Sequence, residues 1–402
     1  MNAATNFWRA PAPRVTVAMA CVYAVLGVTL PFLPRWLSVE RGLSGGEIGA
    51  IMSLAQLARV ATGPLFGVWA DTLSDRRIAL RVLGVAAVAA YAAFFFLAHD
   101  FWSLLAIGFV ALTLSQAIAP FTEAALLRAT AQGRISYGSA RSVGSIAYIV
   151  ANIAGGALVA RFGLGAVVVW TLTWLALFGA SALGVVQRDP APVHTGEAKA
   201  PLFGGLSVLL ANRRFVILIL ACGAIQGAHA FFYSFSSLTW RAQGLSPQLV
   251  GFLWACGTFV EVLFFLSLPV IERFVKPEAF ILIGGAGAIV RWSLMGLAPL
   301  GWVLWPLQAM HAFSFAATHI GAMRLLFREV PERFAGLAQS IYGSFTSGVF
   351  MGAATLISGV LYDHVGARGY WAMAVLAAAG VLMALFLLPR AVPSRLERKR
   401  AP

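Results

Sequence analysis

Two residues of opposite charge, Glu123 and Arg141, stand inside apolar stretches of a 402-residue chain. Glu123 follows an apolar run that begins at Phe101, and Arg141 opens the next run. An unpaired charge in an apolar interior is costly, so each needs a partner or access to water. A carboxylate can carry a proton, and a guanidinium can hold a carboxylate through two parallel hydrogen bonds. The pair therefore indicates either an ion pair that locks two helices or a site for a charged solute.

Other ionisable side chains stand in apolar runs as well, namely Arg59, Glu261, Arg291, His229, His311 and His319. Counted with Glu123 and Arg141, three arginines face two glutamates, which leaves one positive charge without a fixed partner. An anionic substrate would supply the missing charge. Arg59 also lies close enough to the end of its run to reach the membrane surface, so we favour the deeper Arg291 as a ligand.

Some of these groups are candidates for carrying a proton, because histidine titrates near neutral pH and a carboxyl group in apolar surroundings can approach that range. The candidates are Glu123, Glu261, His311 and His319. Single histidines in such runs are also common as packing residues. The run HAFFYSFSSLTW at 229–240 offers His229 and Tyr233 as contacts for a ring-shaped substrate, unless its aromatic side chains face lipid or neighbouring helices.

Composition shows what must position these residues, since 60% of the chain is hydrophobic, 11% is charged and the mean hydropathy is +0.83. A soluble domain cannot bury so much apolar surface, whereas a helix of roughly 20 apolar residues crosses a bilayer. We predict an all-α membrane protein with twelve spans. They lie near residues 14–34, 46–70, 78–98, 101–127, 138–160, 163–186, 214–240, 247–270, 277–297, 300–325, 335–361 and 369–389.

The distribution of basic residues predicts the orientation of these spans. With both termini in the cytoplasm, most of the 29 Lys and Arg residues fall on cytoplasmic segments. The predicted outer segments carry only Arg35, Arg41, Arg161, Arg241 and Arg368. The net charge of +14 then reflects topology, and the basic tail at 390–402 would meet anionic lipid rather than nucleic acid. Cys21, Cys222 and Cys256 lack CxxC spacing, so we expect no disulfide framework, metal site or cofactor.

The chain divides into two similar halves. The polar stretch 187–213 predicts a cytoplasmic linker between six-helix bundles at 1–186 and 214–389. GLSGGEIG at 42–49 returns as GLSPQLVG at 244–251, and TEAALLR at 122–128 returns as THIGAMR at 318–324, which places His319 at the position of Glu123. Ser44 with Glu47 can form a capping box, and Ser246 can cap the corresponding helix alone. Parallel halves with a site between them are typical of rocking secondary transporters.

Several segments resemble the major facilitator superfamily, and within it the branch of lactose permease and the phenylpropionic acid transporters. GPLFGVWADTLSDRR at 63–77 is similar to the loop between its second and third helices, although Thr72, Ser74 and Asp75 depart from the usual residues. Long ordered matches to the phenylpropionic acid transporters are IQGAHAFFYSFSSLTWRAQG, VGFLWACGTFVEV, VRWSLMG and THIGAMR.

The resemblance implies roles for several residues. It makes Glu123 and Arg141 substrate ligands, places Arg291 at the arginine of the ninth helix and His311 near the histidine of the tenth. It also makes Asp71, Arg76 and Arg77 a gating group. The proton-carrying glutamate of lactose permease is not matched, because Ser314 stands there, and Glu261 lies about one turn beyond the expected acid. Its sugar site and proton route therefore cannot be transferred to this chain.

These observations predict a proton-coupled symporter of the major facilitator fold, monomeric and in the bacterial inner membrane, that imports a small organic anion by alternating access. The surplus arginine and the resemblance together favour an aromatic carboxylic acid. The alternatives are a proton-coupled sugar or nucleoside symporter and a drug exporter. An enzyme is disfavoured, because the titratable residues are scattered singly instead of clustered near one membrane surface.

Overall fold

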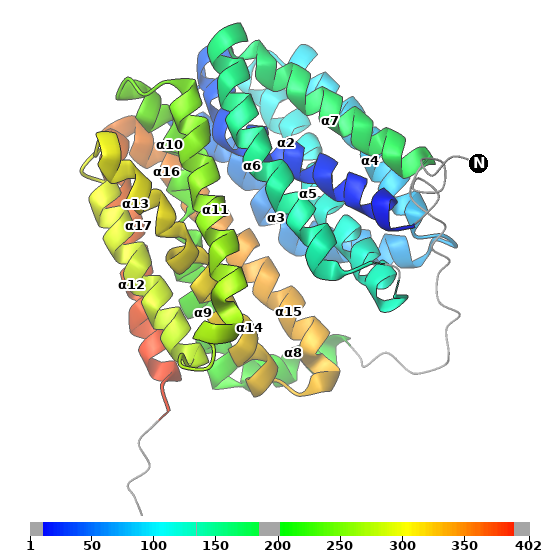
Figure 1. Cartoon of the computed structure of the whole chain (residues 1–402), viewed down its shortest axis with the longest axis vertical. Helices are drawn as coiled ribbons and strands as arrows, with labels where there is room; N and C mark the ends of the chain where they lie inside the picture. Colours follow the sequence, from blue (N-terminus) through cyan, green and yellow to red (C-terminus); the bar gives the residue numbers. More distant parts are fainter. Residues whose placement is uncertain (1–10, 134, 185–201, 390–402) are drawn as a thin grey trace, which may run out of the picture.

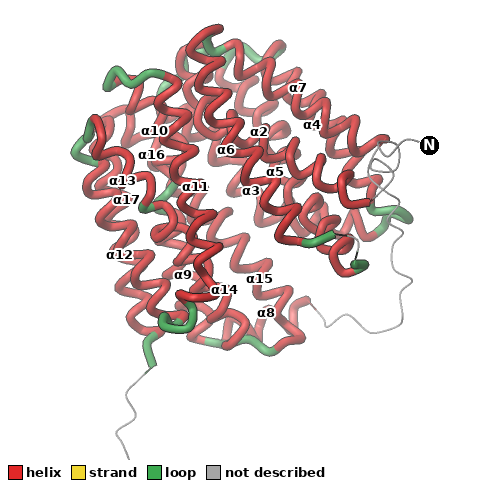
Figure 2. The backbone as a smooth tube through the Cα atoms, viewed as in Figure 1, coloured by secondary structure: helices red, strands yellow, loops and turns green. Residues whose placement is uncertain are grey.

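The computed structural model describes residues 11–133, 135–184 and 202–389, and this part of the chain consists of helices joined by short loops, without strands (Figure 2). Ten helical segments in it are long and apolar enough to cross a membrane. One of them, Glu332–Leu387, contains two helical arms separated by the turn η5 (Gly366–Gly369). The interrupted helix at 301–329 supplies the remaining arm. The predicted all-α fold with twelve spans is confirmed.

The first half forms one bundle of six long helices, which lie side by side in Figure 1. Their bounds are α2 (Pro11–Glu40), α3 (Gly45–Asp71), α4 (Arg77–Phe96), α5 (Phe101–Ala131), α6 (Tyr137–Phe162) and α7 (Gly165–Gly184). Tyr91, Phe94 and Phe95 pack with Trp36 in its buried core. The first bundle thus has an aromatic core that fixes α2 against α4.

The second half contains more interrupted helices. Its elements are α9 (Arg213–Gly227), α10 (Ala230–Ala242), α11 (Pro247–Ile271), α12 (Pro277–Met295), η1 (Gly301–Val303), α13 (Leu304–Ala309), η2 (Ala312–Ala317), α14 (Thr318–Glu329), η3 (Glu332–Phe334), α15 (Ala335–Gly343), η4 (Ser344–Phe350), α16 (Met351–Val365), α17 (Tyr370–Ala384) and η6 (Leu385–Leu387). Both η2 and η4 are π-helical turns, which often mark functional sites. One of them, η2, directly follows His311.

The predicted helix caps form as expected. The Ser44 hydroxyl accepts from the backbone N–H of Glu47, whose carboxylate accepts from the backbone N–H of Ser44, and this completes a capping box. Ser246 caps α11 by accepting from the backbone N–H of Leu249. The repeated G-L-S segments therefore start the second helix of each half in the same way.

The two halves meet closely at one end of the molecule, near the loops at 41–44, 163–164, 243–246 and 366–369. We call this the closed end. Both oxygens of Asp363, on α16, accept hydrogen bonds of 2.7 Å from the backbone N–H groups of Gly45 and Gly46 at the start of α3. A Cβ atom at Gly156 would lie 2.6 Å from the carbonyl oxygen of Pro247 on α11. A Cβ atom at Gly45 would likewise lie 2.6 Å from Oδ1 of Asp363, so glycine at 45 and 156 allows the two halves to meet this closely.

The same helices separate toward the opposite end, which we call the open end and which holds the loop at 72–76. A Cβ atom built at Gly63 or Gly67 on α3 would meet no atom within 4 Å, and the same holds for Gly336 and Gly343 on α15. Leu65 and Val68, on α3, are two-thirds exposed. The halves therefore form a V that is shut at the closed end (Figure 1).

Part of the predicted linker 187–213 folds as the short helix α8 (Leu202–Ala211), which lies near α15 at the open end. The earlier part of the linker and the basic tail at 390–402 lie outside the described residues.

Candidate functional site

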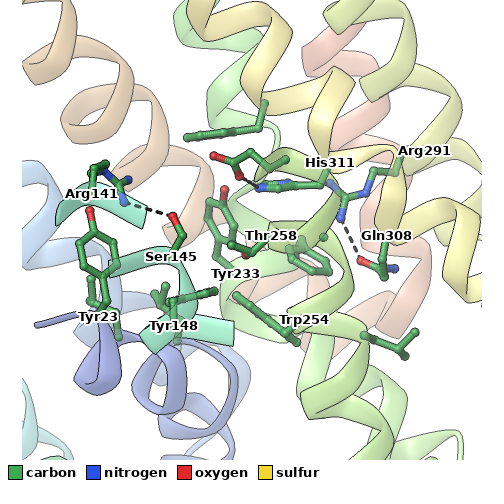
Figure 3. Close-up of a pocket in the computed structure, with 17 residues that line it drawn as sticks. Tyr23, Arg141, Ser145, Tyr148, Tyr233, Trp254, Thr258, Arg291, Gln308 and His311 are labelled. Carbon is green, nitrogen blue, oxygen red and sulfur yellow. Dashed lines mark hydrogen bonds and ion pairs between the residues drawn. The ribbon is translucent and has the colours of Figure 1, made fainter. Parts of the chain in front are cut away.

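A cavity of about 190 Å³ lies between the two halves, and both contribute to its wall (Figure 3). The first half supplies one face of α2 and one face of α6. The second half supplies residues from α10, α11, α12, α13 and η2. The lining residues are Tyr23, Leu26, Leu30, Arg141, Ser145, Tyr148, Phe232, Tyr233, Leu253, Trp254, Gly257, Thr258, Glu261, Arg291, Gln308, His311 and Phe315.

Helical spacing explains how the first half presents its side chains. Arg141, Ser145 and Tyr148 are four and three residues apart, so they share one face of α6. Tyr23 lies on the facing side of the neighbouring helix α2. The polar wall of this half therefore comes from two adjacent helices.

Arg141 stands on this wall with aromatic and hydroxyl contacts. Its guanidinium carbon lies 4.7 Å from the centre of the Tyr23 ring, and Nη1 donates to the Ser145 hydroxyl at 3.3 Å. Within the described residues, no carboxylate lies within ion-pair distance of Arg141. A guanidinium has five N–H donors, so most of its hydrogen-bonding capacity is open to a molecule in the cavity.

Glu123 does not pair directly with Arg141 in this conformer, although we expected opposite charges at one level on adjacent helices. Its Oε1 atom accepts a hydrogen bond of 2.5 Å from the hydroxyl of Tyr137, at the start of α6. Glu123 is also outside the cavity lining. The depth of two residues in a membrane does not fix the rotation of their helices, and here a tyrosine takes the place expected for the arginine.

Arg291 has a different environment, since it is fully buried and acceptors contact both of its terminal nitrogens, whereas its Nε–H has no partner among the described residues. Its Nη2 donates to Oε1 of Gln308 at 2.9 Å, and Nη1 donates to Nδ1 of His311 at 3.1 Å and to the Ser314 hydroxyl at 3.3 Å. Its guanidinium also lies 4.7 Å from the centre of the Phe232 ring. Arg291 reaches the cavity with few donors left for a substrate.

The contact between Arg291 and His311 fixes which ring nitrogen of His311 carries the proton. A guanidinium has no lone pair to accept with, so Nδ1 of His311 must be the acceptor. His311 is therefore neutral in this arrangement and carries its proton on Nε2, which lies 3.3 Å from Oε2 of Glu261. The result is a chain in which Arg291 donates to His311 and His311 donates to Glu261.

His229 lies behind this chain and does not line the cavity, which differs from our expectation of a substrate contact. Its Nδ1 atom lies 3.1 Å from the carbonyl oxygen of Gln226 and must donate to it. Its Nε2 atom then accepts from the Ser314 hydroxyl, 3.1 Å away. His229 is fully buried, so it supports Ser314 and, through it, Arg291.

Aromatic rings form much of the remaining wall. Phe232 and Trp254 are stacked with centroids 4.8 Å apart, and Tyr233 stands beside Trp254. Two other rings of the α10 run, Phe231 and Phe235, pack inward against Tyr370 and Tyr362 instead of facing lipid. The run at 229–240 thus supplies both cavity-facing and core-facing rings, and Tyr233 lines the cavity as predicted.

His319 lies beyond the cavity on the same helical arm as His311. The rings of His311, Phe315 and His319 stack in sequence, with centroid distances of 5.1 and 6.3 Å. His319 also approaches the ring of Tyr342 on α15. It therefore lies on the open-end side of Phe315, outside the lining.

The predicted gating residues lie at the open end. Nη2 of Arg76 lies 3.7 Å from Oδ1 of Asp71. Nε of Arg77 lies 2.6 Å from Oδ2 of Asp75. Arg59, on α3, has no hydrogen-bonding or ionic partner among the described residues and does not line the cavity.

Several lining residues were not singled out in the sequence. Tyr23, Ser145, Tyr148, Trp254 and Gln308 are polar or amphipathic side chains in apolar helices. Gln308 gives the clearest signal, because a buried amide needs hydrogen-bonding partners and here it binds Arg291. The tyrosines give little signal, since they are also common where helices meet the membrane surface.

The chain resembles known transporters over most of its length. It matches the MFS_1 like family over residues 16–373. It is 31% identical over 371 residues to a "Probable 3-phenylpropionic acid transporter" of Escherichia coli K12, which covers 92% of this chain and 94% of that protein. It is 26% identical over 375 residues to the maltose permease of Geobacillus stearothermophilus, which covers 92% of each chain.

Solved structures share the fold at lower identity. A mutant of the nucleoside transporter NupG superposes with a TM-score of 0.78 at 17% identity, covering 93% of this chain and 98% of that chain. A bacterial homologue of the human lysosomal transporter Spinster superposes with a TM-score of 0.69 at 15% identity, covering 93% and 95%. The chain therefore belongs to the MFS_1 like family and is a multi-pass transporter of the major facilitator kind, not an enzyme.

Proposed function

We propose that the protein imports a small aromatic carboxylic acid together with a proton, by alternating access. The observation that carries this proposal is the contrast between the two arginines of the cavity. Arg291 is occupied by Gln308, His311 and Ser314, whereas Arg141 keeps donors that no acidic side chain of the described residues fills. Arg141 is therefore the cation that an anionic substrate would neutralise.

The aromatic part of the substrate is supported by the rest of the wall. Tyr148 on α6 and Tyr233, Trp254 and Phe315 of the second half surround the cavity with rings. Such rings bind an aromatic group through apolar area and offset or edge contacts. The relative named as a probable 3-phenylpropionic acid transporter supports the same substrate class, since a carboxylate and a ring are its two parts.

The proton carrier that we infer is Glu261. It is the carboxylate of the described cavity lining, and it faces His311 across 3.3 Å. Nδ1 of His311 cannot take a proton without losing its hydrogen bond from Arg291, and His229 lies behind the cavity, where its Nδ1 already carries a proton toward the Gln226 carbonyl oxygen. Coupling requires that proton and substrate favour the same conformer, so a protonated Glu261 must assist binding at Arg141 or closure of the two halves.

The conformer fits the inward-facing state of such a cycle. We propose that both termini and the open end face the cytoplasm, because most Lys and Arg residues then lie on cytoplasmic segments. The halves 1–186 and 214–389 would rock as units joined by the linker 187–213. In the outward-facing state, Asp71, Arg76 and Arg77 would come close to the second half and close the cytoplasmic side.

The test is uptake of radiolabelled 3-phenylpropionate into proteoliposomes. We expect accumulation when the outside is more acidic, and competition by other aromatic acids. Maltose, uridine and the neutral 3-phenylpropionamide should not compete. Competition by maltose or uridine would favour the sugar or nucleoside symporter, and efflux of cationic dyes would favour an exporter. Either result, or uptake that ignores the pH gradient, would refute the proposal.

A further inference from the structure

We propose that Tyr23 is a positioning residue that orders the Arg141 side chain and so gives the cavity its preference for carboxylates over neutral analogues. The inference rests on the proposed function, in which Arg141 binds the substrate carboxylate. Tyr23 and Arg141 come from the adjacent helices α2 and α6, and both line the cavity (Figure 3).

The contact places a long, flexible side chain in one position. A free arginine side chain samples many rotamers, and ordering it upon binding lowers affinity. The guanidinium of Arg141 lies 4.7 Å from the centre of the Tyr23 ring, within the range of a cation–π interaction. Its hydrogen bond to Ser145, four residues along the same helix, adds a second restraint. Arg141 is therefore ordered before a substrate arrives.

Tyr23 is an uncharged partner, so its contact with Arg141 does not neutralise the positive charge of the guanidinium. A carboxylate at this place would hold the guanidinium equally well but would compete with the carboxylate of the substrate. The nearby acid, Glu123, is instead held by the hydroxyl of Tyr137. Tyr23 thus restrains the cation without neutralising it.

Gly144 provides the space for this arrangement. It lies one turn after Arg141 on α6, and a Cβ atom there would be 2.8 Å from Cδ2 of Tyr23, 3.0 Å from Cε2 and 3.5 Å from Nη1 of Arg141. The Tyr23 ring therefore occupies the volume that any other residue at 144 would fill. The space that Gly144 leaves on α6 is filled by the Tyr23 ring of α2, and this ring contacts the guanidinium of Arg141.

The experiment measures binding of 3-phenylpropionate and of 3-phenylpropionamide to purified full-length protein by isothermal titration calorimetry. Tyr23→Leu should weaken binding of the acid about tenfold, since it removes a partly desolvated cation–π contact. Binding of the neutral amide should change little. Tyr23→Phe keeps the ring face and should restore affinity for the acid.

A second pair of variants tests the role of Tyr23 even if Tyr23→Leu does not fold. Gly144→Ala should displace the ring and selectively weaken binding of the acid in the same way. Gly138→Ala, near the start of the same helix, should have no effect, because a Cβ atom there meets only the Ser136 hydroxyl at 3.9 Å.

The outcomes distinguish a failure of the role of Tyr23 from a failure of the proposed function. Unchanged affinity for the acid in Tyr23→Leu, equal weakening of acid and amide, or a loss in Tyr23→Phe as large as in Tyr23→Leu would each overturn the role of Tyr23. Normal binding of the acid by Arg141→Gln would instead refute the proposed function itself, whatever the Tyr23 variants do.

Discussion

Arg291 donates a hydrogen bond of 3.1 Å to Nδ1 of His311, and this contact determines which ring nitrogen of His311 carries the proton. It makes His311 a neutral donor toward Glu261, since Nε2 must carry the ring proton. A proton that enters the cavity then has Glu261 as its acceptor unless the contact between Arg291 and His311 breaks. Because the single ring proton of His311 lies on Nε2, Glu261 is a better candidate than His311 for carrying the transported proton.

Glu261→Gln should abolish accumulation driven by a pH gradient while preserving exchange of labelled for unlabelled substrate across the membrane. Glutamine imitates the protonated acid, so the transporter can bind and release substrate but cannot carry a proton. Both activities are measured in the same proteoliposomes. Glu272→Gln at the open end is the control, because Glu272 pairs with Arg324 outside the cavity. Accumulation that survives Glu261→Gln would exclude Glu261 as the carrier.

Arg291→Lys should reduce stability together with substrate binding. An ammonium group cannot reach Gln308, His311 and Ser314 in the same fork geometry, so buried polar groups lose partners at a cost of about 2 to 4 kcal/mol. Thermal unfolding in detergent measures this as a lower midpoint. Arg324→Lys, in a half-exposed ion pair with Glu272, should change stability by under about 1 kcal/mol. Equal midpoints for the two variants would show that the Arg291 network does not stabilise the fold.

Asp363→Asn should shift the protein toward its outward-facing state. The Asp363 carboxylate accepts two hydrogen bonds of 2.7 Å from the start of α3, and these join the two halves at the closed end. Asparagine has one acceptor oxygen and no charge, so closure should weaken by about 1 to 2 kcal/mol. Spin labels at the exposed positions Val39 and Val365, in a background without native cysteines, measure separation of the halves at this end.

The control for this experiment is Glu47→Gln. Glu47 belongs to the capping box at the same helix start, but its contacts stay within the first half. This variant should leave the distance distribution between the labels unchanged. A longer distance in Glu47→Gln, or an unaltered one in Asp363→Asn, would show that the cross-half contact does not hold the closed end together.

Sequence patterns predicted the fold well, because membrane spans depend on length and apolar composition, which are local properties. The caps at Ser44 and Ser246 formed as expected for the same reason. The interruptions of the second half were not predicted. The π-helical turn η2 packs against α11 and α12, which the local sequence does not reveal, and no residue type in 312–317 requires it.

The site was predicted in outline only. Arg141, Arg291, Glu261, His311 and Tyr233 do line one cavity. Which arginine has free donors depends on side-chain contacts between helices that are distant in sequence, so depth in the membrane could not rank Arg141 against Arg291. We expected both Arg141 and Arg291 to bind substrate and preferred Arg291 only over Arg59, whereas the hydrogen bonds of Arg291 to Gln308 and His311 distinguish it from Arg141.

The most direct test of the account is binding and uptake of 3-phenylpropionate by Arg141→Gln, compared with Arg161→Gln near the far end of the same helix. Loss of the carboxylate's cationic partner should lower affinity about a hundredfold in Arg141→Gln. Both variants should insert and fold normally, and Arg161→Gln should transport like the wild type. Affinity and uptake in Arg141→Gln equal to those of Arg161→Gln would contradict the account, because the carboxylate would then bind elsewhere.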